Sequence, residues 1–268
     1  MSLYSPTVNQ SSSGMKVVLL PELVAASQRN MNIDEAMLDV LAECNFAGIA
    51  RLYKWEAPAL SLGRNQHTLP DNWQHLVTDY RLHVVSRPTG GRAVLHLNEL
   101  TIALAFRTDA LGCGGGSRVR CLHKALLPIT TMLMEASGTT VATGAAVGNR
   151  DNRFDCFQAI TEADVVDTRL NTKAAGAALV IRGGLVLQQV SVRSIQVTTN
   201  HSGQLPQFVI DEFYPGCDEI AVVSMNVCLT NFRRILSHFY EVVTDNIVEG
   251  AIYRLVGSRE VRDCGTPA

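Results

Sequence analysis

The sequence predicts an α/β (α+β) domain in which helices flank a mixed, largely antiparallel sheet. Three observations support this prediction. Short strand-like runs separated by Pro and Gly fill the middle of the chain, and segments with helical character lie before, between and after them. The turn signal Arg182-Gly183-Gly184 joins two longer strand-like runs as a hairpin. No period of 20 to 50 residues repeats, so we expect one packed domain rather than a repeat array.

The predicted domain covers residues 16–256 of the 268-residue chain. Residues 1–15 are polar and rich in Ser, without periodicity, and we expect them to form a disordered tail. A short C-terminal tail is expected over residues 257–268. A chain of this length can bury most of its apolar surface without disulfides or metals.

The elements are predicted in a definite order. Helices are expected over residues 21–44, 70–80 and 118–137, with helical periodicity again over 222–255. Pro70 suits the start of its helix, because the first helical position does not need a backbone donor. Strands are expected over residues 49–54, 59–62, 83–86, 92–95, 100–106, 173–181 and 185–192.

Composition excludes several classes of function. The net charge is −2 and the sequence pI about 6.4, so no basic stripe for nucleic acid is expected. No apolar run approaches the roughly 20 residues that span a bilayer, and the N-terminus lacks signal-peptide features. The seven cysteines form no Cys-x-x-Cys pair, which predicts neither a disulfide framework nor a zinc site and favours a reducing cytoplasm.

Residues 86–96 form the first segment with chemical potential. The adjacent Gly90 and Gly91 allow a backbone to approach a ligand closely, while Arg87 and Arg92 are suited to a phosphate or carboxylate. A simple hairpin turn with surface arginines explains the same pattern. The segment alone does not decide between the two.

Two further segments carry a nucleophile and a cation. Cys156 lies at a predicted strand start. Its side chain could be a thiolate nucleophile or simply a small buried group. Lys173 opens a run of small residues over 174–178, where it could polarise a carbonyl or phosphate, or be a solvated lysine beside a tight strand pair. Motifs for P-loop nucleotide binding, dinucleotide binding, zinc proteolysis and serine hydrolysis are absent from the sequence.

Taken in order, these segments resemble the lipoate/biotin protein ligase family, most closely its cysteine-dependent octanoyltransferase branch. The resemblance runs from about residue 17 to 240. The segments that carry it are residues 30–38, 52–66, 87–96 with 99–101, 156–157 and 173–178. It implies the family's ligase-like catalytic fold.

The resemblance implies an acyl transfer. An octanoyl group on acyl carrier protein would pass to the Cys156 thiolate and then to a lysine of a lipoyl domain, in glycine cleavage H protein or a 2-oxoacid dehydrogenase E2 subunit. Lys173 would stabilise the developing oxyanion. A thioester is already activated, so neither ATP nor another cofactor or a metal is expected.

The resemblance also implies a set of site residues. Cys156 and Lys173 are the expected catalytic pair. The expected substrate-binding residues are Arg87, Thr89, Gly90, Gly91, Arg92, Ala93, His96, Gly176 and Ala177. Small side chains there leave a slot in which each buried methylene contributes about 0.8 kcal/mol.

Two other functions remain open at this point. In an ATP-dependent lipoate ligase, Lys173 and the turn over 87–93 would hold lipoyl-AMP, and Cys156 would be incidental. Arg92 favours the transferase, since a third glycine is typical of the ligases. A non-catalytic protein that binds acyl chains or carrier domains is the third hypothesis, motivated by Leu97 and Leu179 at positions where polar residues are expected.

Overall fold

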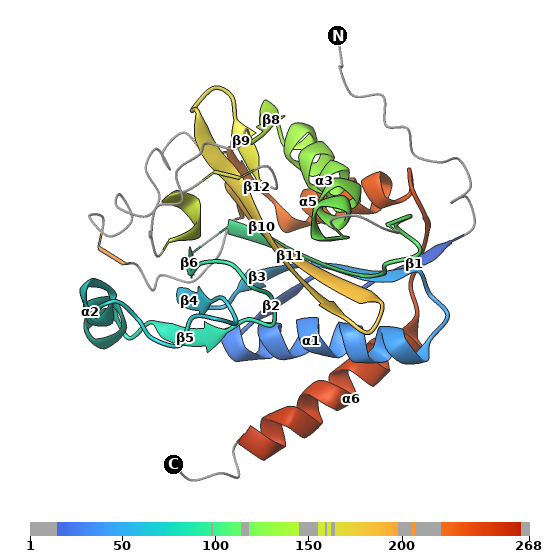
Figure 1. Ribbon diagram of the computed structural model, residues 1–268, viewed down its shortest axis with the longest axis horizontal. Coiled ribbons are helices and arrows are strands. Elements are labelled where there is room, and N and C mark those ends of the chain that lie inside the picture. The colour runs from blue at the N-terminus through green and yellow to red at the C-terminus, as the bar shows by residue number, and fades with distance from the viewer. Residues whose placement is uncertain are drawn as a thin grey trace.

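The computed structural model describes residues 15–97, 99–113, 118–144, 155–158, 160–161, 164–197, 205–206 and 221–263. Within them, a ten-stranded mixed sheet lies between two layers of helices, and a three-stranded sheet stands at one end (Figure 1). The main sheet runs in the order β13-β1-β3-β7-β11-β10-β9-β8, with β2 on β3 and β12 on β11. The predicted fold class is confirmed.

The bounds of the elements are as follows. The helices are α1 (Ser27–Glu43), α2 (Asp71–Tyr80), α3 (Arg118–Ala136), α5 (Met225–Leu236) and α6 (Asn246–Asp263), with the 3-10 turn η2 (Cys156–Gln158). The strands of the main sheet are β1 (Lys16–Leu19), β2 (Leu23–Ala25), β3 (Gly48–Trp55), β7 (Glu99–Arg107), β8 (Val141–Thr143), β9 (Val165–Asp167), β10 (Thr172–Arg182), β11 (Leu185–Val197), β12 (Ala221–Val223) and β13 (Glu241–Val243). The small sheet contains β4 (Ala59–Leu62), β5 (His83–Ser86) and β6 (Val94–His96).

The centre of the main sheet is antiparallel. Strands β3, β7, β11 and β10 pair in this sense, whereas β1, β2, β12 and β13 pair in parallel. The predicted hairpin is confirmed between β10 and β11. Gly183 and Gly184 at its tip have φ of +54° and +85°, as a two-residue hairpin turn with two left-handed positions requires.

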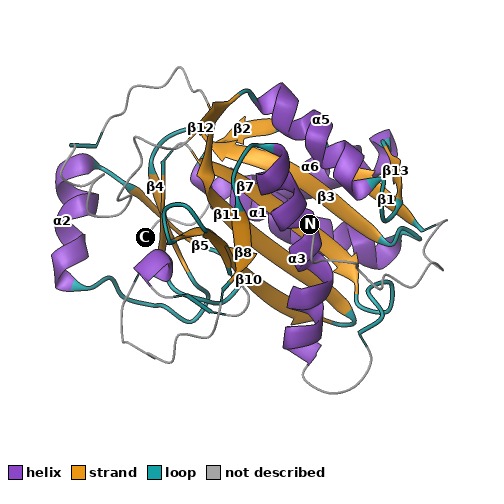
Figure 2. Cartoon of the chain, turned by 90° about the horizontal axis from the view of Figure 1, so that it is seen from above, coloured by secondary structure: helices purple, strands orange, loops and turns teal. Residues whose placement is uncertain are grey.

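Each face of the sheet has its own helix layer. Helices α3 and α5 cover one face, and α1 and α6 cover the other (Figures 1 and 2). Alternate residues of the fully buried strand β3 point to opposite faces of the sheet and pack against the two helix layers. Ala50 and Leu52 pack toward α3 and α5, whereas Ile49 and Tyr53 pack toward α1 and α6. The small sheet has its own core with Trp73 of α2.

Several predicted boundaries are wrong in detail. The expected helix over 21–44 begins only at Ser27, because residues 23–25 form strand β2 and pair with residues 53–55 of β3. Strands β12 and β13 interrupt the helical region expected over 222–255. Helix α6 continues to Asp263, past residue 255, where the predicted helical region ends. Three-residue strands are too short to show an alternating pattern, so β2, β12 and β13 are located only by their pairing partners, which are distant in sequence.

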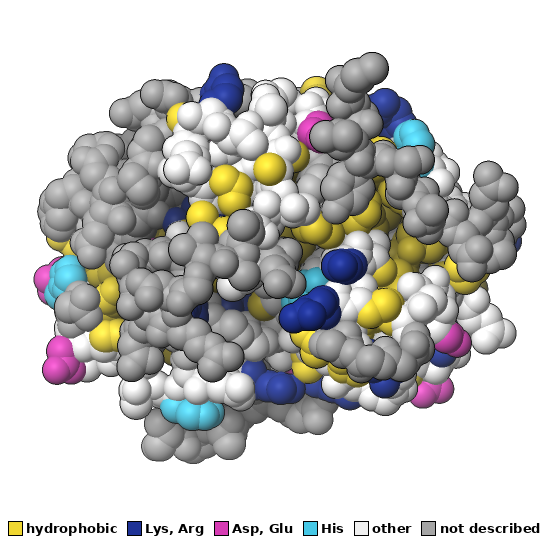
Figure 3. Space-filling view, turned by 45° about the horizontal axis from the view of Figure 1, so that its top comes forward, with side chains coloured by type: hydrophobic (Ala, Val, Ile, Leu, Met, Phe, Trp, Pro, Cys, Tyr) yellow, Lys and Arg dark blue, Asp and Glu magenta, His cyan; other side chains and the backbone are white. Residues whose placement is uncertain are grey.

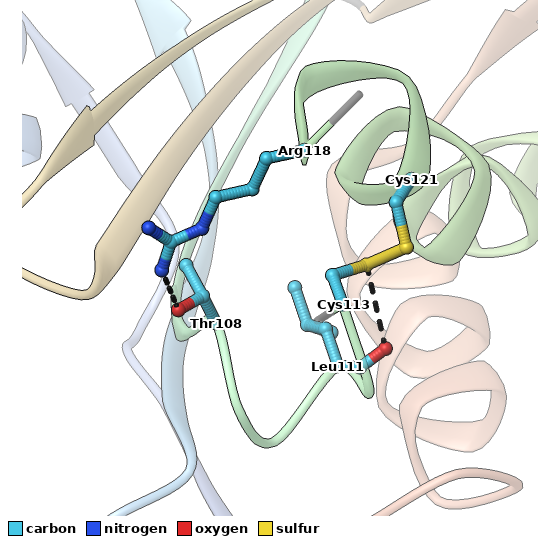
Figure 4. Close-up of a disulfide and its surroundings, with 5 residues drawn as sticks. All are labelled: Thr108, Leu111, Cys113, Arg118 and Cys121. Atoms are coloured by element: carbon cyan, nitrogen blue, oxygen red, sulfur yellow. Dashed lines mark hydrogen bonds between the residues drawn. A yellow bond between two sulfur atoms is a disulfide. The ribbon is translucent and has the colours of Figure 1, made fainter. Parts of the chain in front are cut away.

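A disulfide joins Cys113 to Cys121 (Figure 4). The expectation of no disulfide is therefore wrong, and the cysteines no longer support a reducing compartment. Spacing could not reveal the pair, because the fold rather than the sequence brings the two Cα atoms to 5.7 Å. The bond links the segment after β7 to the first turn of α3. Cys217 and Cys264 lie outside the described residues.

The described surface does not by itself indicate a partner. Lys and Arg side chains lie near the middle of one face, beside hydrophobic side chains (Figure 3). The large hydrophobic side chains that are exposed, Val24, Val84, Val119, Val227 and Ile247, come from five different elements. Within the described ranges, no helix has the length and apolarity needed to cross a bilayer.

Candidate active site

A pocket lies between the α1 side of the main sheet and the small sheet. It contains about 360 Å³ of free space, part of it open to solvent. The described residues that line it are Met31, Tyr53, Trp55, Ser61, Arg87, Val94, His96, Thr101, Cys156, Gly176, Ala177, Ala178, Gln189 and Ser191. The pocket thus brings together the motifs that were singled out in the sequence.

Cys156 and Lys173 meet at this pocket. The Nζ atom of Lys173 lies 3.4 Å from Sγ of Cys156 and donates to the Cys156 carbonyl oxygen at 2.9 Å. The same ammonium forms an ion pair with Asp164 at 2.9 Å, with both side chains about 3% exposed. A buried ammonium beside sulfur can donate to a developing oxyanion or stabilise a thiolate.

An irregularity in β10 turns Lys173 toward the sulfur. The pairing of β10 with β9 shifts between Lys173 and Ala175, so Ala174 is an extra residue in the strand. Lys173 therefore lies on the same face as Gly176 instead of the opposite one. A Cβ atom at Gly176 would lie 2.9 Å from Cε of Lys173 and 3.3 Å from Sγ of Cys156. Any larger residue there would therefore displace Lys173 from the sulfur.

The backbone of Cys156 is held by the strand that follows the Gly-Gly turn. Its N–H donates to the carbonyl of Ala93 at 2.8 Å, and Asp155 forms a parallel bridge with Ala93. Asp155 also accepts from the N–H of Phe157, whose ring lies 3.5 Å from the guanidinium of Arg193. Cys156 therefore belongs to a 3-10 turn, not to the strand start that was predicted.

The Gly-Gly turn is shaped by Arg87. This buried guanidinium donates to the carbonyls of Gly90 (2.8 Å), Arg92 (2.5 Å) and Ser61 (3.1 Å). Burial lowers the pKa of Arg87. Although Arg87 lines the pocket, these bonds to the protein make it a support for the turn. The turn itself packs tightly, since a Cβ atom on Gly63 would lie 1.9 Å from the carbonyl oxygen of Gly91.

His96 forms a fixed polar wall of the pocket. Burial lowers the pKa of its imidazole, although the carboxylate of Glu99 acts in the opposite direction. The neutral ring accepts from Oγ of Ser61 at 2.7 Å and donates from Nδ1 to Glu99 at 2.6 Å. The indole of Trp55 stacks on it with ring centroids 3.8 Å apart. His96 is thereby held in one orientation.

A second buried network lies deeper in the molecule. Asp34 of α1 accepts from Arg51 (2.7 Å), Tyr53 (2.9 Å) and Gln189 (2.5 Å). Gln189 in turn accepts from Oγ1 of Thr89 at 2.6 Å. The network connects helix α1, two strands and the Gly-Gly turn, and its members satisfy one another in the low-dielectric interior.

Comparisons with known proteins identify the family. Residues 26–201 match the model of the lipoyl protein ligase A/B catalytic domain. The chain belongs to this family. It is 32% identical over 252 residues to octanoyltransferase LipM of Moorella thermoacetica, covering 88% of this chain and 92% of that protein. It is 30% identical over 165 residues to octanoyltransferase LipM of Carboxydothermus hydrogenoformans, covering 61% and 59%. These relatives place the chain among the acyltransferases of the lipoyl protein ligase A/B family.

Solved structures share the fold at low sequence identity. Lipoate-protein ligase A bound with ATP matches with a TM-score of 0.62 and 16% identity, covering 91% of this chain and 94% of the other. The bipartite lipoate protein ligase of Thermoplasma acidophilum, described with its E2 lipoyl domain, matches with a TM-score of 0.58 and 15% identity, covering 91% and 92%. At these identities the likeness concerns the lipoyl protein ligase fold.

The predicted site residues fall into two groups in this family domain. Cys156, Arg87, His96, Gly176 and Ala177 line the pocket, and Lys173 contacts Cys156. The members of the turn, Thr89, Gly90, Gly91, Arg92 and Ala93, support the pocket from outside its lining.

Sequence reasoning missed Asp164, Gln189 and Met31. Asp164 pairs with Lys173, whereas Gln189 and Met31 line the pocket. Met31 lies in the segment 30–38 that carries the resemblance, but no role was predicted for it, and Asp164 and Gln189 belong to none of these segments. Only alternation along the second hairpin strand could have indicated that Gln189 faces away from the apolar layer.

Proposed function

We propose that this enzyme transfers an octanoyl group from acyl carrier protein through Cys156 to the lysine of a lipoyl domain. The observation that carries the proposal is the 3.4 Å approach of Lys173 Nζ to Cys156 Sγ at the wall of the pocket. The LipM relatives support the octanoyl group as the cargo. The acceptor class is supported by the E2 lipoyl domain described with the Thermoplasma ligase.

In the first half-reaction, the Cys156 thiolate attacks the carbonyl carbon of the octanoyl thioester. A new C–S bond forms while the bond to the carrier protein's sulfur breaks, and the carrier leaves as a thiol after taking up a proton. The Lys173 ammonium is placed to donate to the oxyanion of the tetrahedral intermediate. The product is an octanoyl thioester on Cys156.

In the second half-reaction, the uncharged amine of an acceptor lysine attacks the same carbonyl carbon. The C–N bond forms, the C–S bond breaks, and Cys156 returns as a thiolate while the amine nitrogen loses a proton. Thioester and amine contain all the atoms of the product amide, so the reaction needs no nucleotide. The pocket would hold the chain through both steps, each buried methylene adding about 0.8 kcal/mol.

Intact-mass measurement after incubation with octanoyl-acyl carrier protein tests the proposal. We expect one octanoyl adduct that Cys156→Ala abolishes. Cys44→Ala is the matched control, because Cys44 is a second half-buried free cysteine that does not line the pocket. Addition of a lipoyl domain should then discharge the adduct and acylate the acceptor without ATP.

The other outcomes separate the alternatives. An ATP-dependent ligase would label the acceptor only when ATP is added and would keep its activity in Cys156→Ala. A binding protein would retain the acylated carrier without forming an adduct. Either result would contradict the proposed transfer through Cys156.

A further inference from the structure

A row of paired residues on the main sheet leads away from Cys156. Gly176 pairs with Ser191, Ser191 with Thr101, and Thr101 with Tyr53, so these four residues form one row across β10, β11, β7 and β3. All four lie on the lining of the pocket. With strands about 4.8 Å apart, the row spans about 14 Å.

An octanoyl chain attached to Cys156 is shorter than this row. Carbon–carbon bonds of about 1.5 Å that meet at about 111° advance about 1.25 Å each, so seven bonds reach about 9 Å. Starting above Gly176 on β10, the terminal methyl group reaches β7, two strands away. The residues that face the methyl group there determine how long a chain the pocket accepts.

Met31 is the lining side chain contributed by helix α1, which packs over the strand that the methyl group reaches. Among the described lining residues it alone comes from an α-helix, α1, which packs over β3, β7 and β11. Its Sδ atom lies 3.6 Å from Nε2 of Gln189, a residue that pairs with Ala103 on β7. Met31 therefore closes the pocket from the helix side.

The neighbours of Met31 are held more firmly than Met31 itself. Tyr53 donates to Asp34, and Trp55 donates to Thr101 at 3.0 Å. Gln189 is fixed at both ends of its amide. The contact of Met31 with Gln189 is a weak bond to a thioether, and methionine adapts its shape readily.

We infer that Met31 sets the upper limit on acyl-chain length in this pocket. The inference rests on the proposed function, in which a straight acyl chain extends from Cys156. Shortening the side chain to alanine removes three heavy atoms and opens room for two or three methylenes. Each buried methylene increases affinity about fourfold, so two additional methylenes increase it more than tenfold. In Met31→Ala, the preference for dodecanoyl over octanoyl should therefore rise at least tenfold.

Two assays measure this preference. In the first, Cys156 is labelled with n-alkyl methanethiosulfonates of six to twelve carbons: the thiolate attacks the alkyl-bearing sulfur, a disulfide forms and methanesulfinate leaves. Peptide mapping gives the labelling rate at Cys156 for each length. In the second, adducts from octanoyl-, decanoyl- and dodecanoyl-acyl carrier protein are compared by intact mass.

Three variants accompany the wild type. Met31→Ala should favour the longer chains in both assays, and Met31→Phe, which fills the pocket further, should favour the shorter ones. Met37→Ala is the matched control: Met37 is fully buried six residues later in α1 but does not line the pocket. It should lose stability like Met31→Ala and keep the wild-type length profile. If Met31→Ala fails to fold, Met31→Phe still tests the inference in the opposite direction.

The two assays separate the inference from the proposed function. A chain-length profile that shifts in the Met31 variants in the alkyl assay supports the inference. If no acyl carrier protein substrate forms an adduct, the proposed function is overturned, but the result of the alkyl assay still stands. Acylation by octanoyl-acyl carrier protein with the same profile in all variants would support the function and overturn the role of Met31. Equal shifts in Met37→Ala would also overturn it.

Discussion

The two faces of the main sheet are built on different principles. The face covered by α3 and α5 is packed with side chains such as Phe106, Leu126 and Phe232, all fully buried and apolar. The face covered by α1 buries charges as well, including Arg51 and Asp34, which are at most 1% exposed. Both faces belong to the same strands, since successive residues of a strand point to opposite sides.

The difference separates stability from function. Apolar packing stabilises the fold without specifying orientations, whereas a buried ion pair costs desolvation free energy that its partners must offset. The charged face accepts this cost where the pocket needs side chains held in one position. The apolar face also carries polar side chains, such as Gln188, whose amide bonds to Nδ1 of His123 at 3.0 Å. The faces should therefore respond differently to substitution.

The largest expected effect is on the apolar face. Phe232→Ala in α5 leaves a cavity in the core and should lower the free energy of unfolding by about 3–5 kcal/mol. Urea denaturation measures this loss. The transfer rate per folded molecule should stay within twofold of wild type, because Phe232 does not line the pocket. A large loss of rate in fully folded protein would show that the two faces are not independent.

The opposite response is expected at Gly176. Gly176→Ala places a Cβ atom 2.9 Å from Cε of Lys173 and pushes that flexible side chain away from Cys156. Octanoyl transfer should fall roughly 100-fold, while the free energy of unfolding should fall by less than in Phe232→Ala. Single-turnover acylation and urea denaturation measure the two quantities. Gly257→Ala in α6, where a Cβ atom has no neighbour within 4 Å, is the control and should keep wild-type activity.

The disulfide offers a smaller test on the apolar side. The bond joins cysteines that are eight positions apart, so replacing both Cys113 and Cys121 by serine should lower the free energy of unfolding by roughly 2.5 kcal/mol. Transfer activity should persist. Dithiothreitol should lower the Tm of the wild type and leave that of the double variant unchanged. A Tm that does not respond to reduction in the wild type would exclude a stabilising bond.

The smallest effect concerns pH. Burial lowers the pKa values of His96 and His123 in the folded state. Below about pH 6.5, the ordinary pKa of histidine, the unfolded chain therefore binds more protons than the folded protein does. Stability is therefore full above pH 6.5 and falls as the pH drops, by at most about 1.4 kcal/mol per pH unit for each histidine. His96→Gln and His123→Gln should each flatten the curve from pH 7 to 5.5. A curve unchanged in His96→Gln would contradict a buried neutral ring on the pocket side.

Most elements of four or more residues could be predicted from the sequence, including β4 and β5, whereas most three-residue strands could not. The strand over 100–106 and the helix over 118–137 have enough residues to show their periods, and the structure places β7 and α3 there. Strands β2, β12 and β13 have three residues each and form because a partner strand is present. The 3-10 turn at Cys156 likewise depends on Ala93, far away in the sequence.

The residues alone indicate the kinds of chemistry available: a cysteine, a lysine beside small residues, and a glycine turn with arginines. How each of them is used depends on the folded chain. The bulge at Ala174 turns Lys173 toward the sulfur, Arg87 becomes a support for the turn, and Asp164 pairs with the ammonium. Periodicity reports which residues are buried, because burial follows local geometry. Distances between side chains of different strands depend on register and bulges, and these are fixed only when the whole sheet has assembled.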